Sequence, residues 1–184
     1  LQSVNEFAKA FKQKYDRLDL LINNAGVMMT PFGKTADGFE LQFGTNHLGH
    51  YALTGLLLEL ITRTPNARVV TISSGGERFG KIDFENLNAE KEYDAGTAYA
   101  QSKLANLLFT YELQRWFERK QVSVMALASH PGYANTNLQL EAPRLRGSAL
   151  GVKMSAFFNR TIAQPAWKGA LPSLYAATSD QAKG

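Results

Sequence analysis

The chain has 184 residues, no cysteine and a formal net charge of +4 at pH 7, with 45% hydrophobic and 20% charged residues. This composition is typical of one globular domain, and the lack of cysteine excludes disulfides and thiolate chemistry and favours a cytoplasmic location. Basic residues are scattered, which disfavours a nucleic-acid partner. No apolar run reaches the length of about 18 residues that a membrane span needs, and the first residues do not have the pattern of a signal peptide.

Three short apolar runs have the length and residue types of buried parallel strands. They lie at 18–23, 68–73 and 122–128. Helical patterns separate them, which predicts an α/β fold: a Rossmann-like doubly wound parallel sheet with helices on both faces. Polar residues and a glycine follow each run. Because ligands bind beyond the carboxyl ends of such strands, the three ends should line one crevice.

Apolar residues recur at helical spacing in the segments around these strands. Helices are expected at 3–15, from 38 to about 62, around 104–111, and after Pro165. Asp37 and Glu40 fit a capping box in which Asp37 is the N-cap of the second helix. Pro165 suits the first helical position of the last helix, whereas Pro172 lies inside that helix and should kink it.

Tyr99 and Lys103 lie four residues apart on the third expected helix and therefore share one face. A neighbouring ammonium lowers the pKa of a tyrosine, which is about 10 in isolation. Such a tyrosine can take a proton when an alcohol is oxidised, or donate one when a carbonyl is reduced. Taken alone the pair is a weak motif, because unrelated surface residues meet the same spacing by accident.

Further motifs occur in the order, and on the elements, where the short-chain dehydrogenase/reductase family has them. They are Asn23-Asn24-Ala25-Gly26, Asn46 in a helix, Ser74 at a strand end, Tyr99 with Lys103, and His130-Pro131-Gly132 with Thr136. The chain resembles this family over nearly its whole length, as a single domain over 1–184 that lacks the family's N-terminal βα units and last strand. The residues around Asp37, Asn46 and Lys103, and the long interval from Ser74 to Tyr99, resemble the retinol-dehydrogenase-like branch.

The resemblance implies four catalytic residues. Tyr99 would be the acid/base, and Lys103 would lower its pKa and bind the nicotinamide ribose. Ser74 would hold the substrate oxygen, because strand alternation lets only one of Ser73 and Ser74 face the crevice and the family match selects Ser74. Asn46 would anchor a water that links Lys103 to solvent; the alternative is that Asn46 only satisfies the backbone of a kinked helix.

The cofactor that the resemblance implies is NAD or NADP, with NADP favoured. The residues implied to bind it are Asn23, Ala25, Gly26, Tyr99, Lys103, Pro131, Gly132 and Thr136. Asn24, by contrast, would tie adjacent strands together. The family's glycine-rich turn and the residue that separates NAD from NADP do not occur in these residues, so the choice stays open. The three histidines show no metal-ligand arrangement, and no metal is expected.

The expected function is hydride transfer between NAD(P)(H) and an apolar alcohol, aldehyde or ketone. The alternatives are a relative that acts on a C=C bond, and a catalytically idle scaffold or redox sensor that keeps the fold. Segment 137–164 is apolar, with interleaved basic residues. We expect it to be a mobile lid that selects an apolar small-molecule substrate, the alternative being an ordinary core helix. The substrate, the reaction direction and assembly into a homo-oligomer stay open.

Overall fold

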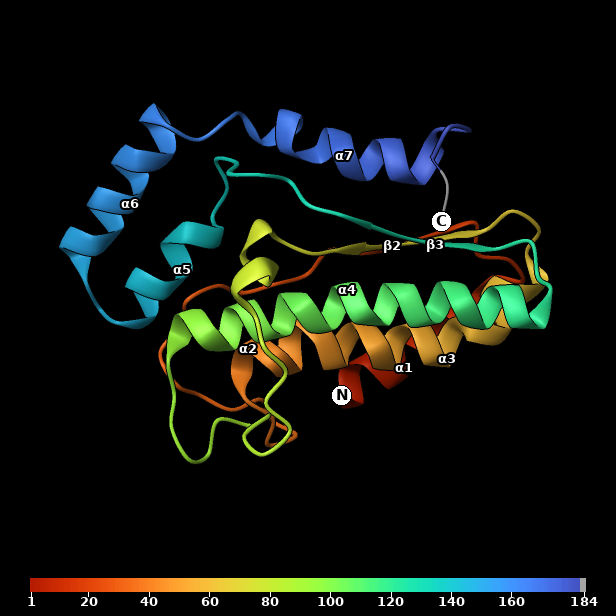
Figure 1. The fold of residues 1–184 in the computed structure, drawn as a ribbon, viewed down its shortest axis with the longest axis horizontal. Helices are drawn as coiled ribbons and strands as arrows, with labels where there is room; N and C mark the ends of the chain where they lie inside the picture. The colour runs from red at the N-terminus through yellow and green to blue at the C-terminus, as the bar shows by residue number, and fades with distance from the viewer. Residues whose placement is uncertain (183–184) are drawn as a thin grey trace.

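A parallel sheet of three strands lies at the centre of the computed structural model, which describes residues 1–182 (Figure 1). The strands are β1 (Leu20–Asn23), β2 (Arg68–Ile72) and β3 (Met125–Ser129), side by side in chain order. Val69 of β2 pairs with Leu21 of β1 and with Ala126 of β3. Helices form both connections between strands, as the alternating pattern predicts.

Helices cover both faces of the sheet (Figure 1). One face carries α1 (Gln2–Lys14), α3 (Gly49–Arg63) and α4 (Ala95–Lys120), and the other carries α7 (Ala166–Thr178). Val69 packs into the first interface and Val70 into the second, because successive side chains of a strand point to opposite faces. The predicted doubly wound α/β architecture is therefore confirmed.

The first strand is less buried than its sequence predicts. Leu21 and Asn23 are buried, but Leu20 and Ile22 are 42% and 41% exposed. These two side chains point to the face on which α7 packs against β2 and β3, so α7 does not cover them. Ile22 instead contributes to the wall of the cavity described below.

The predicted capping box at the second helix is wrong. Glu40 itself is the N-cap: its carboxylate accepts hydrogen bonds from the amides of Gln42 and Phe43 at 2.8 and 2.7 Å. Asp37 lies outside the helix and is not its N-cap. The helix then runs through α2 (Leu41–Phe43), a π-helical stretch (Gly44–Leu48) and α3. The π turn widens the helix at the position of Asn46.

The remaining elements frame the carboxyl ends of the strands. A 3₁₀ helix, η2 (Gly75–Phe79), follows β2, and α5 (Leu138–Leu145) and α6 (Ala149–Thr161) follow β3 and pack on each other. β3 begins later than predicted, since the Val122 amide still bonds to the carbonyl of Phe117 at the end of α4. Pro165 is the N-cap of α7 rather than its first residue, and the helix continues through Pro172.

Among residues 1–182, no helix has both the length and the apolarity that crossing a bilayer requires.

Candidate active site

The carboxyl ends of the strands meet at a cavity of about 460 Å³. Its wall includes Asn24, Ala25, Gly26, Ser73, Tyr99, Lys103, Pro131, Gly132 and Thr136. The structure thus brings together all of the predicted cofactor-binding residues except Asn23. The side chain of Asn23 is buried beneath the cavity, where its amide nitrogen donates to the hydroxyls of Thr54 and Thr71 at 3.1 and 3.4 Å. Asn23, and not Asn24, is therefore the residue that ties neighbouring elements together.

Lys103 is buried beside the tyrosine ring. Its Nζ lies 5.8 Å from the centroid of the Tyr99 ring and donates to the backbone carbonyl of Ile72 at 3.1 Å. Only 5% of the lysine is exposed, and this burial lowers the pKa of its ammonium to about 8. The nearby Glu77 carboxylate opposes that shift. Lys103 therefore stays charged at pH 7 at some cost in folding free energy.

The pKa of Tyr99 is raised above its usual value of 10, and the predicted lowering by Lys103 stays a prediction. Burial of the phenol is the largest cause, and the negative charge of Glu77 acts in the same direction. A hydrogen bond between the side chains of Ser74 and Tyr99 acts in the opposite direction. The phenol is consequently in its acid form at neutral pH.

The two adjacent serines have different surroundings. The Ser74 hydroxyl caps η2, accepting from the Gly76 amide at 3.2 Å, and the Ser74 side chain acts to lower the pKa of Tyr99. The Ser73 hydroxyl is buried and bonds to the Glu77 carboxylate and, at 2.8 Å, to the backbone carbonyl of Lys103. Ser73 lies in the cavity wall but its hydroxyl is engaged by these contacts, whereas Ser74 is not part of that wall. The role of Ser74 in meeting a substrate oxygen therefore stays a prediction.

Asn46 is fully buried and joins the loop after β1 to α4. Its Oδ1 accepts from the Val27 amide at 2.8 Å, and its Nδ2 donates to the Val27 carbonyl and to the Ser102 hydroxyl, both at 2.9 Å. A Cβ added at Gly26 would lie 3.2 Å from Asn46 Oδ1 and 3.7 Å from Lys103 Nζ, so an alanine here would force the Asn46 side chain to shift by a few tenths of an ångström. The Asn46 side chain positions the cavity wall; its implied role in holding a water stays a prediction.

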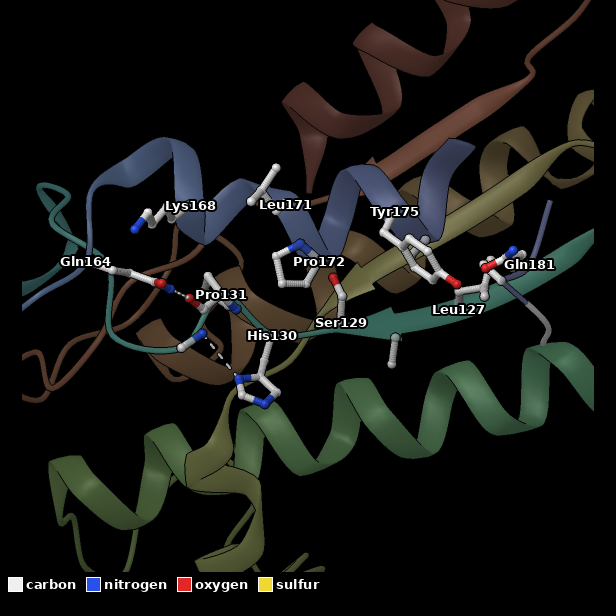
Figure 2. Close-up of a pocket in the computed structure, with 14 residues that line it drawn as sticks. Leu127, Ser129, His130, Pro131, Gln164, Lys168, Leu171, Pro172, Tyr175 and Gln181 are labelled. Atoms are coloured by element: carbon white, nitrogen blue, oxygen red, sulfur yellow. Dashed lines mark hydrogen bonds between the residues drawn. The ribbon is translucent and has the colours of Figure 1, made fainter. Parts of the chain in front are cut away.

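The segment after β3 forms another wall of the cavity. His130 Nδ1 accepts from the Gly132 amide at 3.2 Å, and Gln164 Nε2 donates to the Pro131 carbonyl at 2.6 Å (Figure 2). Gly132 has φ +64°, a left-handed conformation that favours glycine. A wider, open hollow of about 890 Å³ between β3 and α7 begins at the same segment, but no predicted catalytic residue lines it.

Sequence reasoning missed Glu77. Its carboxylate accepts from the Ser73 hydroxyl and, at 3.2 Å, from the Ser74 amide, and it forms a capping box with Ser74 at the start of η2. The signal was present, because Ser74-Gly-Gly-Glu77 is the serine-x-x-glutamate pattern of a capping box. Within residues 1–182 no three histidine, aspartate or glutamate side chains are grouped so that they could hold a metal ion.

The site and fold agree with a family comparison. The family model described as short chain dehydrogenase matches residues 1–145, and the chain belongs to this family. Mouse (Mus musculus) retinol dehydrogenase 14 is 44% identical over 186 residues, which cover 100% of this chain and 54% of that protein. Mouse retinol dehydrogenase 11 is 50% identical over 137 residues, covering 74% of this chain and 43% of that protein. These relatives support the retinol-dehydrogenase-like branch.

Solved structures agree with this assignment. An uncharacterized protein from Mycobacterium Paratuberculosis superposes with a TM-score of 0.73 at 43% identity, covering 97% of this chain and 55% of its own. A short chain dehydrogenase from Escherichia coli CFT073, solved in complex with NADPH, has a TM-score of 0.63 at 17% identity over 98% and 65% of the two chains, which indicates a shared fold. The chain spans about half the length of the curated relatives it matches.

Proposed function

We propose that the protein transfers hydride between NADP(H) or NAD(H) and an apolar carbonyl or alcohol. The observation that carries this proposal is the meeting of Tyr99 and Lys103 in the wall of the cavity where the strands end, with the Ser74 hydroxyl close to the Tyr99 ring. A partly buried phenol beside a serine hydroxyl and an ammonium is the set of groups that carbonyl reduction needs: an acid, an anchor for the oxygen and a positive charge.

The cavity wall fits a nicotinamide cofactor. Gly26 and Gly132 both lie in the cavity wall, and Lys103 and Thr136 also line it. When bound, the cofactor would supply or accept the hydride. Ala25 and Gly26 would hold its adenosine half, and Pro131, Gly132 and Thr136 its nicotinamide half, as the family resemblance implies. NADP remains the favoured form in this proposal.

The residues of the chain supply the proton and the orientation. In reduction, the Ser74 hydroxyl donates a hydrogen bond to the substrate oxygen, and the Tyr99 phenol gives its proton to that oxygen as hydride reaches the carbon. The phenolate left behind lies beside the Lys103 ammonium, which stabilises it. Oxidation runs the same steps in reverse and needs the phenolate at the start, so a raised pKa of Tyr99 makes oxidation favour alkaline pH.

Segment 137–164 supports the choice of an apolar substrate. Leu138 of α5 lies in the cavity wall, and Arg146 Nη2 donates to the Met29 carbonyl at 3.0 Å, which joins this segment to the loop after β1. On α6, Leu150 and Phe157 are exposed. An apolar helix pair beside the cavity would exclude water from an apolar substrate. The mobility of this segment stays a prediction, as do the cytoplasmic location, the absence of a nucleic-acid partner and any homo-oligomer.

The direct test is turnover by the intact protein. NADPH and NADH oxidation would be followed with a panel of apolar aldehydes and ketones, and with an α,β-unsaturated ketone whose product reveals C=C reduction. Tyr99→Phe should lower kcat by about 10²–10⁴-fold without loss of cofactor binding. Tyr111→Phe is the matched control, because Tyr111 lies on α4 and is 53% exposed. Absence of turnover in the wild-type protein would favour the scaffold or sensor alternative.

A further inference from the structure

The carboxylate of Glu77 connects the predicted substrate-binding serine to the catalytic helix. It accepts from the Ser74 amide at 3.2 Å and from the Ser73 hydroxyl, and that hydroxyl also contacts the backbone carbonyl of Lys103 at 2.8 Å. The helix η2, which begins at Gly75 and contains Glu77, packs on α4: a Cβ placed at Gly76 would lie 3.5 Å from Tyr99 Cε1 and 3.6 Å from Ser74 Oγ. Glu77 therefore sits where it can set the orientation of the Ser74 hydroxyl against the Tyr99 ring.

The charge of Glu77 acts on both titrating groups of the site. It raises the pKa of Tyr99 and opposes the loss of charge that burial imposes on Lys103. The other titratable groups from packed elements are His47, in the π-helical stretch, and His50, on α3; burial lowers the pKa of both, so both are neutral at pH 7. At neutral pH, Glu77 is thus the negative charge that acts on both Tyr99 and Lys103.

Resting on the proposed function, we propose that Glu77 is a positioning residue that orients Ser74 and sets the site for carbonyl reduction at neutral pH. A negative charge beside the phenol keeps the O–H bond of Tyr99 intact until a substrate oxygen takes the proton. The same charge keeps Lys103 protonated, so the ammonium can stabilise the phenolate that forms. Reduction breaks the phenol O–H bond and forms the alcohol O–H bond, while the reduced nicotinamide supplies the hydride to carbon.

The test separates the charge of Glu77 from its hydrogen bonds. Glu77→Gln keeps an oxygen that can accept from Ser73 and Ser74 but removes the charge, whereas Glu77→Ala removes both. In the intact protein, Glu77→Gln should move the pH profile of kcat/KM for alcohol oxidation to lower pH by about half a unit to one unit, the shift expected for one partly solvated charge. At pH 7, kcat for alcohol oxidation should rise several-fold. Glu77→Ala should show the same shift and, in addition, a loss of kcat in both directions, because Ser74 is no longer oriented.

Glu85→Gln is the control, since it removes the same charge from an exposed position of the 75–96 insert. A second readout is independent of turnover: the tyrosinate absorbance of Tyr99, taken as the difference between each protein and its Tyr99→Phe counterpart, should titrate at lower pH in Glu77→Gln. If that titration and the oxidation profile are unchanged in an active Glu77→Gln enzyme, the role of Glu77 is refuted while the proposed function stands. If the wild-type protein shows no turnover, the proposed function itself fails, and the bias toward reduction fails with it.

Discussion

Replacing the buried lysine of the site should stabilise the fold while it removes activity. The pKa of Lys103 falls from 10.5 to about 8 on folding, because burial disfavours its charged form. A difference of about 2.5 pKa units corresponds to about 3 kcal/mol. The free energy of unfolding is lower by this amount as long as Lys103 is charged. Because the unfolded chain binds more protons between pH 8 and 10.5, this cost is fully present below pH 8 and disappears as the pH rises through that window.

Lys103→Met removes the charge and keeps an unbranched side chain of similar length. The variant loses the bond from Nζ to the Ile72 carbonyl, but that carbonyl still accepts from Asn106 Nδ2 at 3.1 Å and is not left without a partner. After the lost hydrogen bond is subtracted, we expect Lys103→Met to be about 1–2 kcal/mol more stable than wild type at pH 7. At pH 10.5 this advantage should vanish.

Urea unfolding of the intact, cofactor-free protein at pH 7 and at pH 10.5 measures this difference. Lys9→Met is the control, because Lys9 is an exposed lysine of α1 and its replacement should change neither value appreciably. The reasoning is refuted if Lys103→Met is less stable than wild type at pH 7, or if its stability relative to wild type is the same at the two pH values.

Three further predictions concern the frame of the site. Gly26→Ala should raise KM for the cofactor, because the new Cβ would lie 3.2 Å from Asn46 Oδ1. Gly55→Ala is the control and should leave KM unchanged, because there is open space around Gly55. Steady-state kinetics measure both values. The pKa of His50 is lowered from 6.5 to about 4. The free energy of unfolding should therefore fall by up to about 3 kcal/mol as the pH drops from 6.5 towards 4. In denaturant titrations, His50→Gln should make this pH dependence weaker. Glu40→Ala should lower the free energy of unfolding by about 2 kcal/mol, because two capping hydrogen bonds are lost, and Asp37→Ala should lower it much less. Equal losses of stability in thermal unfolding would contradict the role of Glu40 as the N-cap.

The periodicity of the chain was enough to predict the sheet, the helices on its two faces and the crevice at the strand ends. These features depend on which residues are apolar and at what spacing, and that information is local. The pairing of Tyr99 with Lys103 was equally predictable, because a spacing of four on a helix places two side chains on one face whatever surrounds them.

Features that depend on several elements at once were not predictable in this way. The pKa of Tyr99 is raised, because it depends on burial of the phenol and on the charge of Glu77 from another element. Glu40 and not Asp37 caps the helix, since the two carboxylates differ in what they reach in space and not in type. Local pattern determines which secondary structure forms, whereas the energy of a charge or a hydrogen bond depends on neighbours that only the packed structure brings together.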